Sequence, residues 1–231
     1  MNDFSLLGAA LVAVVALYMM LRWEARHGNA ASCTRDLWEV ALAAMIAGLA
    51  AGRLWAMIRA GVNPLQHPGD IVIVRGGVDT SAAAVTAVAA VAVLARGDVV
   101  AVADGLAAAT LAGLAGWHTG CLFQDTCAGV TTDLPWAIHL TGSGVGRHPV
   151  ELYAAATLAG AALAVALWKR RVPPAGSPAA AALAAAGIVR ALTEPLRPSL
   201  VGGPVWLYLM GAAAGVGIVW WQTRADAASG P

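Results

Sequence analysis

The sequence contains few charged residues. Lys, Arg, Asp and Glu together make up 12% of its 231 positions, and the formal net charge is +1. There is no basic stripe of the kind that neutralises the phosphates of a nucleic acid. There is also no Gly-rich phosphate loop of the Walker type. These absences argue against a nucleic-acid partner and against a P-loop nucleotide site.

What the sequence has instead is a series of long apolar runs. Hydrophobic residues account for 59% of the chain, a composition typical of a polytopic membrane protein. A run of about 18 to 20 apolar residues is long enough to cross a bilayer as a helix. Seven runs are predicted as spans: 4–21, 37–58, 80–95, 99–117, 150–168, 179–192 and 205–221. The predicted fold is therefore an all-α bundle of about seven transmembrane helices, forming one domain over residues 1–224, with a disordered tail over 225–231.

The basic residues lie mostly on one side of these spans. They are Arg22, Arg26, Arg35, Arg96, Lys169, Arg170, Arg171 and Arg224. By the positive-inside rule that side is cytoplasmic, so the N terminus should lie outside and the C terminus in the cytoplasm. Under this topology, segment 118–147 is an extracytoplasmic loop.

Four charged residues interrupt the apolar runs: Arg53, Asp104, Arg190 and Glu194. A charge in the bilayer costs several kcal/mol unless it is paired or reaches water, so these side chains should face an interior cavity. Arg190 and Glu194 are four residues apart and can pair on one helical face. The pair could simply staple the bundle, or Arg190 could hold a lipid phosphate, for which a guanidinium fork is well suited.

A polar segment opens the run over residues 150–168. It reads Arg147-His148-Pro149-Val150-Glu151-Leu152-Tyr153. Pro149 suits the first turn of a helix, Glu151 complements the helix dipole, and Tyr153 suits the membrane interface. A simple helix start therefore explains these three residues, but it does not require Arg147 or His148.

The order of these motifs resembles the prolipoprotein diacylglyceryl transferase family. In that family an Arg-His-Pro-x-Gln-Leu-Tyr-Glu motif opens a transmembrane helix, and an Arg-x-x-x-Glu-x-x-Arg pattern closes the next. The first motif is matched here by Arg147, His148, Pro149, Leu152 and Tyr153, and the second by Arg190, Glu194 and Arg197. The resemblance continues through segment 51–54, the Gly76-Gly77 turn, Asp104 and the loop over 120–129.

The resemblance implies a membrane transferase of the bacterial inner membrane. It would move a diacylglyceryl group from phosphatidylglycerol to the lipobox cysteine of a prolipoprotein and release glycerol phosphate. Its partners would be these two substrates and the surrounding membrane lipids, and no cofactor is implied. The chemistry requires a base for the thiol, cations for the phosphate and a cavity open to lipid.

The resemblance also suggests roles for individual residues. Arg190 and Arg147 are expected to bind phosphate, with Arg53 as a further cation. His148 is the expected base and His118 the other candidate. The remaining substrate-binding residues are predicted to be Tyr153, Glu194, Asp104 and Ser81, with Glu194 and Asp104 orienting the arginines.

The chain departs from the family pattern at several polar positions. Ser81 stands where the family has a histidine considered important for catalysis. His118 replaces an arginine, Cys121 and Gln124 replace asparagines, and Thr126 and Ala154 each replace a glutamate. Either a nearby histidine has taken over as base, or the chain keeps the fold as a lipid-binding or thiol-handling protein.

The three cysteines also allow two interpretations. Cys121 and Cys127 share the loop over 118–147 with His118 and His139, so metal or redox chemistry is conceivable there. Their spacing fits neither Cys-x-x-Cys nor an established zinc pattern, and no metal site is predicted. A disulfide is equally consistent, because the loop should face an oxidising compartment. Cys33 is expected to be a free thiol.

Overall fold

A computed structural model gives the fold and describes residues 5–27, 35–72, 77–123, 127–139, 142, 144–198 and 204–229. The α-helices are α1 (Ser5–Arg26), α2 (Leu37–Arg59), α3 (Gly69–Val72), α4 (Thr80–Leu94), α5 (Val99–Thr119), α6 (Val150–Lys169), α7 (Ser177–Thr193) and α8 (Val205–Ser229). Two 3-10 helices, η1 (Gly120–Phe123) and η2 (Glu194–Leu196), follow α5 and α7. The strands are β1 (Ala128–Thr131), β2 (Ile138–His139) and β3 (Gly146–Pro149). The predicted helical, polytopic fold is confirmed.

Six of the described helices, α1, α2, α5, α6, α7 and α8, are long and apolar enough to cross a membrane. The remaining predicted span, α4, has 15 residues. At a rise of 1.5 Å per residue it covers about 22 Å, less than a hydrocarbon core of about 30 Å. The helix is short because Asp79 caps its start and Gly97, with a φ of 92°, turns the chain just after its end. The described residues thus contain six helices long enough to cross a membrane and a seventh, shorter apolar helix, in agreement with the predicted bundle of about seven.

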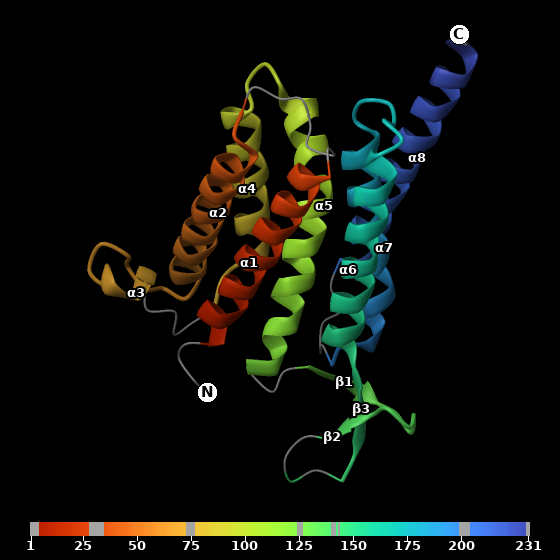
Figure 1. The fold of residues 1–231 in the computed structure, drawn as a ribbon. Helices are drawn as coiled ribbons and strands as arrows, with labels where there is room; N and C mark the ends of the chain where they lie inside the picture. The colour runs from red at the N-terminus through yellow and green to blue at the C-terminus, as the bar shows by residue number, and fades with distance from the viewer. Residues whose placement is uncertain are drawn as a thin grey trace.

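Helix α5 lies in the middle of the bundle, with α1, α2 and α4 on one side and α6, α7 and α8 on the other (Figure 1). Its buried residues belong to both hydrophobic clusters of the core. Leu111 packs with residues of α6 and α7, and Leu106 packs with residues of α1 and α2. Because α5 is packed on both sides, side chains at its end are held in fixed positions.

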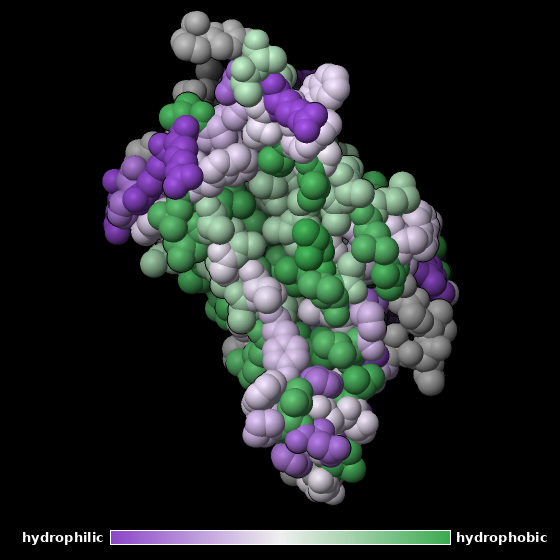
Figure 2. Space-filling view, turned by 90° about the vertical axis from the view of Figure 1, so that its right-hand side faces the viewer, coloured by the Kyte–Doolittle hydropathy of each residue, from purple (hydrophilic) through white to green (hydrophobic). Residues whose placement is uncertain are grey.

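The two ends of the bundle differ in charge. The basic residues that predict the cytoplasmic side lie where α1, α4, α6 and α8 end and just before α2 begins (Figure 1). A belt of apolar side chains covers the helices between the polar ends (Figure 2). The start of α1 and the end of α8 lie at opposite ends of the bundle. This follows because an odd number of helices runs along the bundle when the shorter helix α4 is included. Which end faces the cytoplasm remains a prediction.

Two segments predicted to be irregular contain regular structure. The segment over 118–147 carries an antiparallel sheet in the order β1-β3-β2. These strands are short, and β1 and β3 contain glycine, so no alternating pattern in the sequence predicted them. Helix α8 continues through Ser229, into the predicted tail over 225–231. Its alanines there favour helix, and residues 230 and 231 lie outside the described part.

Close helix packing depends on glycine at particular positions. A Cβ added to Gly215 of α8 would lie 2.7 Å from the backbone N of Ala184 and would collide with the carbonyl oxygen of Ala180, both on α7. Two residues further along α8, a Cβ on Gly217 would meet nothing within 4 Å. Small residues thus allow the backbones of α7 and α8 to approach each other closely.

Gly215→Ala should therefore destabilise the bundle by about 1–3 kcal/mol, because the two helices must move apart. Thermal unfolding in detergent measures this effect. The matched variant Gly217→Ala should be neutral or slightly stabilising, since alanine is the better helix former. Equal melting temperatures for the two variants would contradict this account of α7–α8 packing.

Candidate functional site

A pocket of about 320 Å³ lies where the sheet meets the ends of the helices. Its walls come from β1, the start of α6 and the segment at η2. The lining residues are Cys127, Ala128, Val150, Glu151, Glu194, Arg197 and Pro198. Two carboxylates and a guanidinium in one small pocket make it a candidate functional site.

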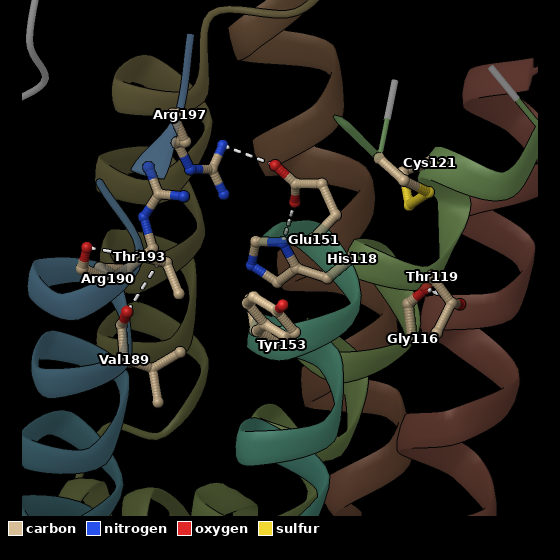
Figure 3. A network of polar contacts seen from close by, with 12 residues as sticks. Gly116, His118, Thr119, Cys121, Glu151, Tyr153, Val189, Arg190, Thr193 and Arg197 are labelled. Atoms are coloured by element: carbon tan, nitrogen blue, oxygen red, sulfur yellow. Dashed lines mark hydrogen bonds and ion pairs between the residues drawn. A yellow bond between two sulfur atoms is a disulfide. The ribbon is translucent and has the colours of Figure 1, made fainter. Parts of the chain in front are cut away.

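Glu151 joins two distant parts of the chain at this pocket. One carboxylate oxygen, Oε2, lies 2.6 Å from Nδ1 of His118 in the last turn of α5. The other oxygen, Oε1, lies 2.8 Å from Nη1 of Arg197, just after η2. The His118 side chain is only 9% exposed and that of Glu151 18%, so water screens these contacts weakly. Figure 3 shows the carboxylate between the imidazole and the guanidinium.

A second carboxylate, Glu194, extends the cluster to α7. Arg190 donates from Nη2 to Glu194 Oε2 and to the hydroxyl of Tyr208, each at 3.1 Å. The guanidinium of Arg190 also lies over the Tyr208 ring, 5.0 Å from its centroid. Arg197 Nε is 3.7 Å from the same Glu194 oxygen. The predicted Arg190–Glu194 pair is confirmed, and it forms part of a larger ionic network.

Several guanidinium N–H groups near this end are buried without a hydrogen-bond acceptor in the described residues. They include Nη2 of Arg197 and Nε of Arg147. Arg147, on β3, uses Nη1 to donate to the carbonyl of Gly129 on β1, at 3.0 Å. A buried donor without a partner is costly, and an anionic ligand would satisfy it. The geometry is therefore suited to bind a phosphate.

His148 belongs to a neighbouring group. Its Nδ1 lies 3.4 Å from the hydroxyl of Tyr153, which also accepts a 2.7 Å hydrogen bond from Nε1 of Trp136. The His148 and Tyr153 rings meet edge to face. Trp136 itself is 57% exposed. Of the two predicted histidines, His118 contacts the carboxylate of the pocket and His148 contacts this aromatic group.

Arg53 and Ser81 lie on the α2–α4 side of the bundle. Arg53 is buried and donates to the carbonyls of Asp70, at 2.9 Å, and Gly77, at 2.8 Å. Ser81 is exposed in the first turn of α4, next to Asp79. The N–H of Ala82, helped by the Arg59 guanidinium, holds the pKa of Asp79 below its ordinary value. These contacts order the turn before α4. Helix α5 lies between α4 and α6, the helix that carries Glu151 of the pocket (Figure 1).

Asp104 does not orient an arginine of the pocket. Its Oδ2 accepts from the backbone N–H of Gly176 at 2.6 Å, and its Oδ1 accepts from Ala179 at 3.0 Å. It thereby caps the start of α7, at the opposite end of α5 from His118. The helix rise places the two residues about 21 Å apart. The predicted orienting role of Asp104 is corrected to a structural one.

The two loop cysteines form a disulfide. The Cα atoms of Cys121 and Cys127 are 4.9 Å apart, and both residues are buried. Within the described residues no three His, Cys, Asp or Glu side chains gather as metal ligands. The bridge holds Cys127, a residue of the pocket wall, against the end of α5. Gln124, Thr126 and Gly76, singled out in the sequence, lie outside the described residues, as does Cys33.

In a Cys33→Ser background, maleimide should label the protein only after reduction, because Cys121 and Cys127 are oxidised and buried. Mass spectrometry of labelled peptides, with and without reductant, measures this difference. Labelling of both cysteines in unfolded but unreduced protein would show that the thiols are free. Unfolding without reductant is the needed control, since burial alone also protects a thiol.

Glu151 is the residue of this site that was not expected from the sequence. It fits well at the start of α6, where a carboxylate favours the helix dipole, so nothing about it demanded a further explanation. Two departures from the family pattern could nevertheless have pointed to Glu151. His118 replaces a family arginine, and Glu151 stands where the quoted family motif has glutamine. Those two altered positions contact each other directly.

The long apolar helices and the ionic cluster around Glu151 together indicate the class of protein. The protein is a multi-pass membrane protein with a network of arginines and carboxylates at one end of its bundle, next to the sheet. The family model described as prolipoprotein diacylglyceryl transferase matches residues 4–221, and the chain belongs to this family of membrane transferases. A search of curated proteins gives no match.

Proposed function

We propose that the protein transfers a diacylglyceryl group from phosphatidylglycerol to the lipobox cysteine thiol of a prolipoprotein, in the bacterial inner membrane. Family membership supports prolipoprotein diacylglyceryl transfer in general. The observation that supports a phospholipid as donor is the set of buried guanidinium N–H groups without acceptors around an ionic pocket. Such a site suits the single negative charge of a phosphodiester head group.

In this proposal the arginines hold the phosphate. Arg197 lines the pocket, and Arg190 approaches from α7 through their shared partner Glu194. Arg147 contributes from the sheet side. As the glyceryl carbon–oxygen bond breaks, negative charge grows on the leaving phosphate. Cations already fixed by carboxylates stabilise that charge without reorganising. Tyr153 and His148 form a rim on which the precursor peptide is held.

The test is turnover in a bilayer. Purified protein in vesicles containing phosphatidylglycerol receives a lipobox peptide, and thioether formation and glycerol phosphate release are measured together. Vesicles of phosphatidylcholine alone and a peptide with serine in place of cysteine are the matched controls. Product confined to the complete reaction supports the proposal. Folded protein that yields no product, while an ordinary family member does so in the same vesicles, favours a lipid-binding or thiol-handling role.

A further inference from the structure

We propose that Glu151 is a positioning residue that makes His118 the base for the acceptor thiol. This inference rests on the proposed function, because it concerns how the cysteine of the precursor is activated. Cysteine attacks as the thiolate, and an unperturbed thiol with a pKa of about 8.5 is mostly protonated at neutral pH. An enzyme of this type therefore needs a group that accepts the thiol proton.

The contact with Glu151 selects one tautomer of His118. A carboxylate can only accept, so the ring nitrogen next to it, Nδ1, carries the hydrogen at a separation of 2.6 Å. In the neutral imidazole this leaves the lone pair on Nε2. Figure 3 shows that second nitrogen turned toward the side where Arg190 and Arg197 lie. The base thus faces the cations that would hold the phosphate.

Burial and the second carboxylate oxygen hold this arrangement in place. The His118 side chain is 9% exposed, at the end of the well-packed helix α5, and has little freedom to turn. Oε1 of Glu151 is held at 2.8 Å by Arg197. The Glu151 carboxylate therefore positions both His118, the proton acceptor, and Arg197, a ligand of the phosphate. The groups that act on the thiol and on the phosphate are thus held in one fixed arrangement.

The charged groups of this cluster come from three elements besides α5. They are Glu151 on α6, Arg190 on α7, and Glu194 and Arg197 at η2. The two cations and the two carboxylates balance, so the imidazole can gain a proton without creating a large net charge. Glu151 keeps its own charge throughout and stabilises the imidazolium that forms.

The proton and electrons balance over the whole step. Nε2 of His118 takes the proton from the cysteine S–H, and the sulfur electron pair forms the new bond to the glyceryl carbon. The bond from that carbon to the phosphate oxygen breaks, and its electrons leave with glycerol phosphate. The proton then passes from Nε2 to the departing phosphate, which restores the neutral imidazole for the next turnover.

A double-mutant cycle on the full-length protein tests the inference. Glu151→Gln should lower kcat about 10²-fold at pH 7, with little change in the KM for phosphatidylglycerol, because general-base catalysis contributes about 10² to 10⁴-fold. His118→Ala should lower kcat at least as far. The double variant should be no slower than His118→Ala, because residues that act as one unit are not additive. Glu39→Gln, an exposed glutamate on α2, is the matched control and should match the wild type.

The pH dependence separates this role from a purely structural one. As the pH rises toward 9.5 the free thiol ionises by itself, so the deficit of each variant should shrink. A Glu151→Gln deficit that is constant with pH, or that multiplies with that of His118→Ala, would overturn the inference. So would a Glu151→Gln rate equal to the wild type. If Glu151→Gln does not fold, His118→Gln, which leaves the Glu151–Arg197 pair in place, provides the same pH comparison. Absence of product from the folded wild-type protein would instead refute the proposed function.

Discussion

Arg190→Ala should lower diacylglyceryl transfer by about 10² to 10³-fold while leaving a folded protein in the membrane. This is the usual loss when one fixed electrostatic stabiliser of a developing charge is removed. Glu194 and Tyr208 hold the Arg190 guanidinium, and the Arg190 side chain is 29% exposed and thus accessible to a ligand. Thioether yield and glycerol phosphate release in vesicles measure the effect, and the melting temperature in detergent reports folding.

Arg59→Ala is the matched control for this variant. Arg59 also lies in the last turn of its helix, pairs with a single carboxylate, Asp79, at 3.1 Å, and is 70% exposed. Removing it changes the protein charge by the same amount, yet transfer should stay near the wild-type rate. Turnover retained by Arg190→Ala would remove Arg190 from the mechanism. Arg190→Lys should restore little, because an ammonium cannot reproduce the planar fork.

Much of the fold could be predicted because a bilayer imposes simple rules. Apolar length and the placement of basic residues indicate the spans and the two ends of the bundle. The helix period also indicates the Arg190–Glu194 pair, since residues four apart share a face. The short length of helix α4 was harder to predict, because its residues are as apolar as those of a full span. Its limits are set by Asp79 and Gly97, whose effect is local.

Contacts between distant segments could not be predicted in the same way. Asp104 was expected to pair with a cation, but a half-buried carboxylate is equally satisfied by the free N–H groups at a helix start. The choice depends on where α7 begins relative to α5, which no spacing in the sequence reveals. The contact between His118 and Glu151 joins residues 33 positions apart, across a disulfide loop and a sheet. The sequence offered the disulfide as one of two interpretations, whereas the sheet lay in a segment without periodicity.

The largest loss of stability is expected from Lys169→Met. Lys169, at the end of α6, lies 2.7 Å from Glu24 Oε1 on α1 and donates to the carbonyl of Gly105 on α5. The two side chains are only 6% and 2% exposed. Removing one partner of a buried pair leaves an uncompensated charge and typically costs about 3–5 kcal/mol. The melting temperature in detergent should fall by roughly 10 °C, since 1 kcal/mol corresponds to about 2–4 °C in a protein of this size.

The double variant Glu24→Leu/Lys169→Met distinguishes a structural pair from a catalytic one. Replacing both charges with apolar residues of similar size is often neutral for stability, so most of the melting temperature should return. The pair lies where α1 and α6 end, whereas the pocket lies where α6 begins, so transfer by the double variant should remain near the wild-type rate. Figure 1 shows the two ends of α6. A double variant that is stable but does not catalyse transfer would show that this pair takes part in the reaction. If the double variant recovers both the melting temperature and the transfer rate, Glu24 and Lys169 serve to hold α1, α5 and α6 together. The charged residues that take part in the reaction are then those of the cluster around Glu151.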